Sequence, residues 1–138
     1  MADITQRKAD TDHQDGVVLS FKQGAESIFE GALVTTNAAG FAINGGDDAN
    51  TVLAGVADES VDNSAGSAGD KSIKVRRTGV FTFVAAFTAS QADVNTLVYI
   101  SDNQSVDVAG TTTNDVLVGR IVEVISTSKV RVDIRDRV

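Results

Sequence analysis

The chain has 138 residues, 42% of them hydrophobic, and a formal net charge of −7 from 19 acidic and 12 basic side chains. Its length and apolar content suit one compact domain, and the lack of cysteine excludes disulfides, thiolate metal sites and thiol redox chemistry. The acidic balance disfavours nucleic-acid binding, and the longest apolar run, Val80 to Phe87, is far below the roughly 18 residues that cross a bilayer. We therefore expect neither nucleic acid nor a membrane as a partner, and synthesis as a soluble chain in the cytoplasm.

The first 15 residues are mostly polar or charged and show no apolar period. This composition predicts an extended N-terminal arm over residues 1–15, mobile in isolation and able to lie on a partner. His13, the one histidine of the chain, falls inside this arm. Because a general base needs a held geometry and an orienting partner, we expect no catalytic or metal-binding role for His13.

From Gly16 onward, short β-branched and aromatic runs alternate with breaks rich in Gly, Asn, Asp and Ser. The chain contains no proline, so each reversal depends on residues that tolerate positive φ or hydrogen-bond their own backbone. This spacing predicts a single all-β domain over residues 16–138, a compact small barrel or sandwich of about nine or ten short strands. The many strand edges must be covered by closure, charge or a neighbouring subunit.

A basic cluster lies between Ala68 and Ala86. Read with a period of two, the apolar and polar residues there alternate as in a half-buried strand. The pattern predicts one strand that bends or bulges at Thr78–Gly79 and turns Arg77 out to the rim. Two interpretations stay open for the cluster, an exposed face that keeps the strand soluble or an electrostatic contact with an acidic protein. The cluster consists of Lys71, Lys74, Arg76 and Arg77.

Two later segments have clear local signals. The sequence SQAD, from Ser90 to Asp93, matches a capping box and predicts one short helical turn. The segment from Lys129 to Arg135 alternates strictly, which predicts a strand with a second basic stripe on its outer face. Its inward residues are Val130, Val132 and Ile134, and its outward residues are Lys129, Arg131, Asp133 and Arg135.

The sequence lacks the motifs of common hydrolases: there is no G-x-S-x-G, no phosphate-cradling glycine loop with a lysine and no HExxH. None of the acidic groups has the alternate-residue spacing of a calcium hand, so we expect them to be solvated turn residues. Tyr99 is expected to be a strand aromatic with its hydroxyl at the rim. We therefore expect no catalytic residue, metal or cofactor. The acidic groups considered are Asp47, Asp48, Asp58, Glu59, Asp62, Asp102 and Asp107.

The order of several short motifs resembles the tailed-phage capsid cement, or head decoration, protein family. The likeness covers roughly Gly31 to Ile134. Such proteins often carry glycine where this chain has Asn95, and asparagine tolerates the same left-handed turn. The matching features are Gly55–Ala57, the turn Gly66–Asp70, GVF at Gly79–Phe81, VYISD at Val98–Asp102 and VGRIVEV at Val118–Val124.

This resemblance implies a non-enzymatic, β-rich virion protein, typically a homotrimer, on the outer surface of a phage head. It would be made in the bacterial host cytoplasm, bind the major capsid protein and stabilise the head against internal pressure. Binding through a trimer would multiply a modest affinity at each site. The arm and the basic cluster are then the expected capsid contacts. The candidate contact residues are Arg7, Lys8, Lys71, Lys74, Arg76 and Arg77.

Two other classes remain as alternatives. A virion-displayed β-sandwich that binds a carbohydrate or a receptor would need clustered exposed aromatics, whereas the chain has one tyrosine and no tryptophan. A small β-barrel enzyme could use a carboxylate pair such as Asp102 and Asp107.

Overall fold

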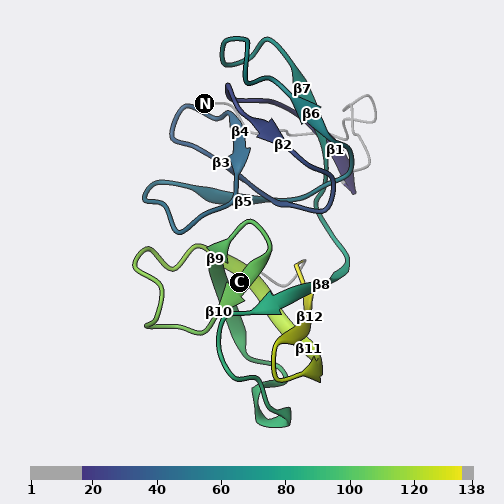
Figure 1. Cartoon of the computed structure of the whole chain (residues 1–138), viewed down its shortest axis with the longest axis vertical. Coiled ribbons are helices and arrows are strands. Elements are labelled where there is room, and N and C mark those ends of the chain that lie inside the picture. Colours follow the sequence, from purple (N-terminus) through teal and green to yellow (C-terminus); the bar gives the residue numbers. More distant parts are fainter. Residues whose placement is uncertain (1–16, 135–138) are drawn as a thin grey trace, which may run out of the picture.

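The computed structural model describes residues 17–134, and within them it confirms the all-β fold class (Figure 1). The arm predicted for residues 1–15 and the outward Arg135 lie outside the described residues. Residues 17–134 form twelve strands instead of nine or ten, partly because β2 (Ser27–Ile28) and β6 (Val61–Asp62) are two-residue strands that pair with each other.

The first half of the chain forms an antiparallel sheet of five strands in the order β1-β7-β5-β3-β4. An isolated bridge joins Gln23, just after β1, to Ala42 in β4, so the two ends of the sheet curl towards each other. β2 and β6 form a separate pair beside it. The five strands are β1 (Val18–Lys22), β7 (Ser72–Arg76), β5 (Val52–Ala57), β3 (Leu33–Thr36) and β4 (Ala42–Asn44).

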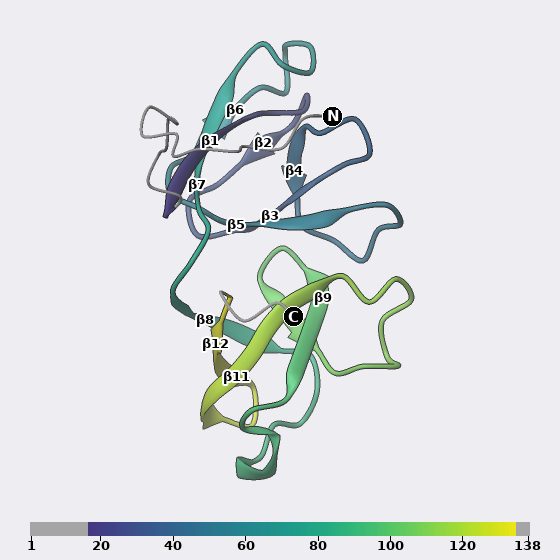
Figure 2. The same ribbon diagram turned by 180° about the vertical axis from the view of Figure 1, so that it is seen from behind.

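The second half forms a closed barrel in the order β10-β8-β12-β11-β9. Figure 2 shows β11 running between β9 and β12 on the rear side. Closure comes from a short parallel pairing of β10 with β8, at Ser105 with Val84, which removes the open edges that invite aggregation. The barrel strands are β8 (Val80–Ala85), β9 (Leu97–Asp102), β10 (Ser105–Asp107), β11 (Leu117–Ser126) and β12 (Lys129–Asp133).

The predicted single bent strand through Thr78–Gly79 is wrong, because β7 ends at Arg76 in the first sheet and β8 begins at Val80 in the barrel. The alternation was correct on both sides of the break, with Val75 and Phe83 buried. A period of two specifies which side of a strand is buried but not which sheet the strand joins. Arg77 is half-buried and does not turn out to the rim.

The sheet and the barrel share apolar packing. Leu33, Leu53 and Val56 come from the first sheet, yet they belong to the same buried cluster as the barrel interior. The backbone N–H of Leu33 also donates to the carbonyl of Asn103 in the β9–β10 turn, at 2.8 Å. A second cluster, which includes Ile73, fills the interior of the first sheet.

Three local predictions are confirmed. A 3₁₀ turn spans Gln91–Asp93, and the Asp93 carboxylate accepts a hydrogen bond from the backbone N–H of Ser90 at 2.8 Å, as a capping box requires. Asn95 has φ of 73°, the left-handed conformation expected for it. On the last strand, the three inward residues are fully buried, while Lys129 and Arg131 are exposed.

Gly119, in β11, is required by a close backbone contact. A Cβ atom at this position would lie 2.1 Å from the carbonyl oxygen of Asp133. That oxygen belongs to the neighbouring strand and cannot swing away, so any larger residue forces β11 and β12 apart.

We predict that Gly119→Ala lowers the free energy of unfolding by about 1–3 kcal/mol, the usual cost of overpacking. Gly46→Ala is the matched control, because its added Cβ would meet only the carboxylate end of the flexible Asp48 side chain. Chemical denaturation of both variants measures the difference. Equal stability of Gly119→Ala and the wild type would show that the strands can separate without cost.

Candidate interaction surfaces

The basic cluster lies on β7 and its two flanks. Lys71 and Lys74 are exposed, whereas Arg76 and Arg77 are half-buried. The Arg77 guanidinium lies 5.8 Å from the centre of the Phe21 ring on β1, within the range of a cation–π contact. Arg77 is therefore partly a packing residue. The other two sequence candidates, Arg7 and Lys8, lie outside the described residues.

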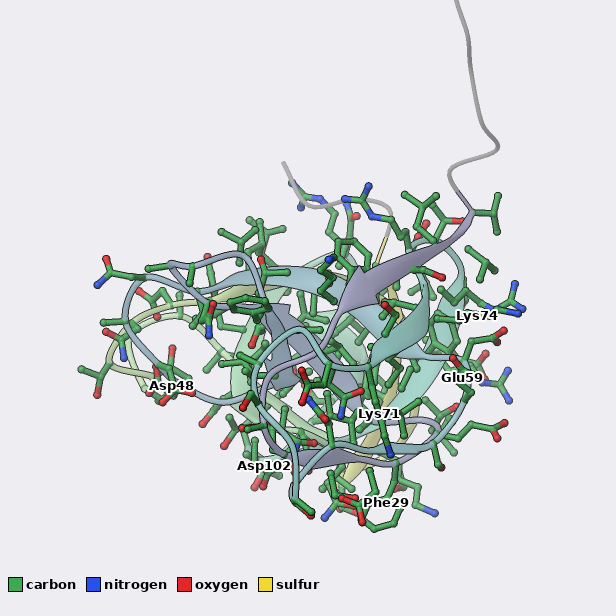
Figure 3. All side chains as sticks on the ribbon, turned by 90° about the horizontal axis from the view of Figure 1, so that it is seen from above. Phe29, Asp48, Glu59, Lys71, Lys74 and Asp102 are labelled. Atoms are coloured by element: carbon green, nitrogen blue, oxygen red, sulfur yellow. The ribbon has the colours of Figure 1, made fainter. Side chains whose placement is uncertain are left out.

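Acidic residues from the segment after β5 lie against this cluster. Asp58 Oδ1 accepts from Arg76 Nη2 at 3.2 Å, and Glu59 Oε2 accepts from the backbone N–H of Lys74 at 2.9 Å. Figure 3 shows Glu59 and Lys74 on the same side of the molecule. An exposed ion pair such as Arg76–Asp58 contributes about 0–1 kcal/mol. Within the cluster, the charge of Arg76 is thus paired, whereas Glu59 reaches Lys74 at its backbone N–H.

Lys71 links the basic cluster to β6. Its Nζ donates to the backbone carbonyl of Asp62 at 2.7 Å. The hydroxyl and backbone N–H of Ser64 donate to the Asp62 carboxylate and hold the pKa of Asp62 below its ordinary value, and the charge of Lys71 lowers it further. Asp62 therefore stays ionised, as a surface turn residue.

Basic side chains are confined to part of the described structure, whereas acidic side chains are spread more widely. Residues 23–70 and 78–119 contain acidic side chains but no lysine or arginine. Within residues 17–134, every basic side chain lies on or next to β1, β7, β11 or β12. The β4–β5 and β10–β11 loops project together from the side opposite β1 and β12 (Figure 1). These two loops therefore carry acidic and no basic side chains.

Asp47 joins these two loops. Its carboxylate oxygens accept the backbone N–H groups of Thr113 at 2.7 Å and Asn114 at 2.8 Å, and its backbone carbonyl accepts Asn114 Nδ2 at 2.8 Å. The two backbone donors favour the ionised carboxylate and lower the pKa of Asp47. No local sequence pattern predicts this contact, because the partners are more than 60 residues apart.

A cleft of about 540 Å³ opens between the same two loops. Asp48 and Asp115 supply carboxylates to its lining, and Val52 beside it is 69% exposed. Leu53 and Val116 lie at its buried side. The combination of apolar lining and acidic rim suits a partner surface that carries aliphatic and basic side chains. We call this feature the acidic cleft.

A second exposed apolar feature is Phe29, in the turn after β2, whose side chain is 66% exposed. A smaller cleft of about 260 Å³ runs from Phe29 to Asn103 and Gln104 in the β9–β10 turn. This feature therefore bridges the sheet and the barrel. The composition does not predict the exposure of Phe29, because that exposure depends on how the turn packs against the rest of the fold.

The carboxylates considered for catalysis have local structural roles. Asp102 Oδ1 accepts from the backbone N–H of Gln104 at 2.9 Å, and Asp107 Oδ1 accepts from that of Val108 at 2.8 Å. Each caps a turn at the end of its own strand. Tyr99 is half-buried in β9, next to Asp107 in the strand register. Among the described residues, no three His, Asp or Glu side chains gather closely enough to hold a metal ion.

Comparison of the chain with models of protein families, with characterised proteins and with solved structures finds no match. Between residues 17 and 134 there is also no helix with the length and apolar character needed to cross a bilayer.

We predict that the Asp47 contact makes the folded state acid-sensitive. Because folding lowers the pKa of Asp47, its contribution to stability is present at neutral pH and is lost as the pH falls below about 4. The Asp47→Asn variant should therefore show a smaller loss of melting temperature between neutral and acidic pH than the wild type. It should also show faster amide hydrogen exchange at Thr113 and Asn114 at neutral pH.

Asp48→Asn is the control for this experiment, since it removes the same charge from the adjacent exposed residue and leaves the three Asp47 hydrogen bonds in place. It should exchange at Thr113 and Asn114 as the wild type does. Unchanged exchange in Asp47→Asn would show that the loops are held together without the carboxylate.

Proposed function

We propose that this chain is a non-enzymatic virion protein that binds the outer surface of a phage capsid and stabilises the head. The observation that carries the proposal is the order of motifs between Gly31 and Ile134, which resembles that of the tailed-phage capsid cement family. In this proposal the partner is the major capsid protein, the working form is a homotrimer, and the protein is made in the host cytoplasm before it joins the virion.

Two features of the surface agree with a role in adhesion. Large aliphatic or aromatic side chains are exposed on both the sheet and the barrel, including Phe29, Val52 and Val84. Stable association depends on many such contacts repeated across an interface. The carboxylates that an enzyme could have used, Asp102 and Asp107, cap turns instead.

The basic cluster contributes to capsid binding mainly through Lys71 and Lys74, whose side chains are exposed. Arg76 is paired with Asp58, and Arg77 lies over Phe21, so both are already engaged within the chain. A rim charge chiefly affects the association rate and the salt dependence of binding. The arm, with Arg7 and Lys8, remains the second candidate contact.

A virion-displayed module that binds a carbohydrate or a receptor is the alternative function. Phe29 gives such a module one exposed ring for stacking on a sugar. The cleft beside it, with polar groups from Asn103 and Gln104, would be the place to look for a bound glycan. Retained glycan binding after Phe29→Ala would exclude that site.

The proposal predicts saturable binding to empty, expanded heads of the virus that encodes the chain. Purified protein is mixed with the heads, the shells are sedimented, and the copies bound per shell are counted. We expect a fixed number at saturation for the full chain and weaker binding after deletion of residues 1–15, because an ordered arm would add contact area. The absence of saturable binding by the full chain would refute the proposal, and equal binding of both forms would refute the role of the arm.

A second prediction concerns the basic cluster. Lys74→Glu should weaken attachment to the shells severalfold and make it less salt-sensitive, because it reverses an exposed rim charge. Its stability should stay within about 0.5 kcal/mol of the wild type, as is usual for exposed surface positions. Lys22→Glu on neighbouring β1 provides the control with the same charge change. If both variants weaken binding equally, only the net charge matters and the cluster is not a specific contact.

A further inference from the structure

Asn44, the last residue of β4, and Gly45 form the one Asn-Gly pair of the chain. Asparagine deamidates most readily before glycine, because glycine has no side chain to hinder attack of its amide nitrogen on the neighbouring side-chain carbonyl. Asn44 is half-buried and Gly45 is buried, beside β3 in the first sheet (Figure 1). The chain therefore carries a chemically reactive pair inside its fold and not in an exposed loop.

Hydrogen bonds hold both polar atoms of the Asn44 side chain. Its Nδ2 donates to Glu26 Oε1 at 3.0 Å and to the carbonyl of Ser27 at 2.9 Å. Its Oδ1 accepts from Asn103 Nδ2 in the β9–β10 turn at 3.1 Å, so this side chain also joins the first sheet to the barrel. The side-chain carbonyl of Asn44 can approach the nitrogen of Gly45 only when these bonds are given up.

Gly45 is fixed by its contact with Leu33 on β3. Its N–H donates to the carbonyl of Leu33 at 2.8 Å, and a Cβ at this position would lie 2.9 Å from the same oxygen. A larger residue would push the chain away from β3, so the fold requires glycine directly after Asn44. Attack on Asn44 needs this same nitrogen to be released from Leu33 and deprotonated. The reaction therefore requires local opening of the sheet.

We propose that Asn44–Gly45 is a deamidation site that the native fold keeps unreactive and that converts when β4 separates from Glu26 and β3. The deprotonated nitrogen of Gly45 attacks Cγ of Asn44, a C–N bond forms, and the side-chain nitrogen leaves as ammonia. Water then opens the resulting succinimide at one of its two carbonyls and gives aspartate or isoaspartate. This proposal goes beyond the proposed function and does not depend on capsid binding.

The product does not fit the place that Asn44 occupies. A carboxylate oxygen replaces the donor Nδ2 and faces the carboxylate of Glu26 and the carbonyl of Ser27, which are both acceptors. Isoaspartate also adds one methylene to the backbone where Asn44 pairs with Val34, and this disturbs the β3–β4 register. A chain that has opened for long enough to react therefore cannot regain its full stability. Deamidation at this site marks opened molecules irreversibly.

The first test compares the full wild-type chain in its native state and in guanidinium chloride, at the same mildly alkaline pH and temperature. Peptide mapping by mass spectrometry measures conversion of Asn44. We expect conversion in the native state to be at least about tenfold slower, because a closed site reacts only through its small open population. Hydrogen exchange at the Gly45 amide measures that opening directly, since the same N–H must leave Leu33 before it exchanges or reacts.

A variant that loosens the site tests whether opening controls the reaction. Glu26→Ala removes the oxygen that accepts from both Nδ2 and the backbone N–H of Asn44. It should raise Gly45 exchange and Asn44 deamidation severalfold and by the same factor. Glu30→Ala is the control, because it removes the same charge from an exposed turn residue and leaves the contacts of Asn44 in place. Circular dichroism checks that both variants fold.

The consequence of deamidation is tested by encoding the product. Asn44→Asp should lower the melting temperature by at least about 3 °C, and adding Glu26→Gln should recover part of the loss, because glutamine can donate to the new carboxylate. Asn50→Asp is the control with the same change in charge, at an exposed residue whose φ of 60° aspartate also tolerates.

Four results would overturn the inference. They are equal deamidation of native and denatured chains, no conversion of Asn44 in denaturant, an Asn44→Asp variant as stable as Asn50→Asp, and faster deamidation in Glu26→Ala without faster exchange at Gly45. Failure of the chain to bind capsids would refute the proposed function and leave this inference standing, because none of these measurements involves a capsid.

Discussion

The burial of Leu33, Leu53 and Val56 against the barrel interior is the constraint on which the rest of the molecule depends. These three side chains belong to the first sheet, yet they complete the core of the second. Their contact fixes the sheet over the mouth of the barrel and brings the β4–β5 loop next to the β10–β11 loop. Asp47 can bind Thr113 and Asn114 only in that arrangement. The acidic cleft, and with it the main charge asymmetry, thus follows from shared apolar packing.

The net charge around the basic cluster is lower in the folded structure than its sequence suggests. Counted along the sequence, Lys71 to Arg77 is the most basic stretch and invites a search for an acidic partner. In three dimensions Asp58 pairs with Arg76, and Glu59 and Asp62 contact the segment through backbone groups, so the cluster is partly compensated. The uncompensated charge of the molecule is negative and lies at the loops on the opposite side. The exposed lysines of the cluster and the exposed carboxylates of the loops therefore offer an acidic and a basic partner surface, respectively, a site of opposite charge.

Local patterns predicted the features that depend on neighbours in the sequence. The alternation of Val130 and Val132, the turn at SQAD and the left-handed Asn95 follow from the residues within a few positions. The strand break at Thr78–Gly79 was misread, because alternation continues through a chain that passes from one sheet to another. The Asp47 contact and the acidic cleft could not be predicted, since they join residues brought together only by the packing of sheet and barrel. The exposure of Val52 could not be predicted for the same reason.

The order in which the barrel strands pair has a consequence for biosynthesis. β8 is made early in the barrel, but its antiparallel neighbour is β12, the last barrel strand to leave the ribosome. Until β12 arrives, β8 and β11 each present an unsatisfied backbone edge, and Leu33 and Leu53 have no completed interior to enter. Such nonlocal pairing slows folding and leaves partly folded intermediates that are prone to aggregation. A chain that stops before Lys129 would lack β12 and could not complete the barrel. We expect such a chain to aggregate or to be degraded.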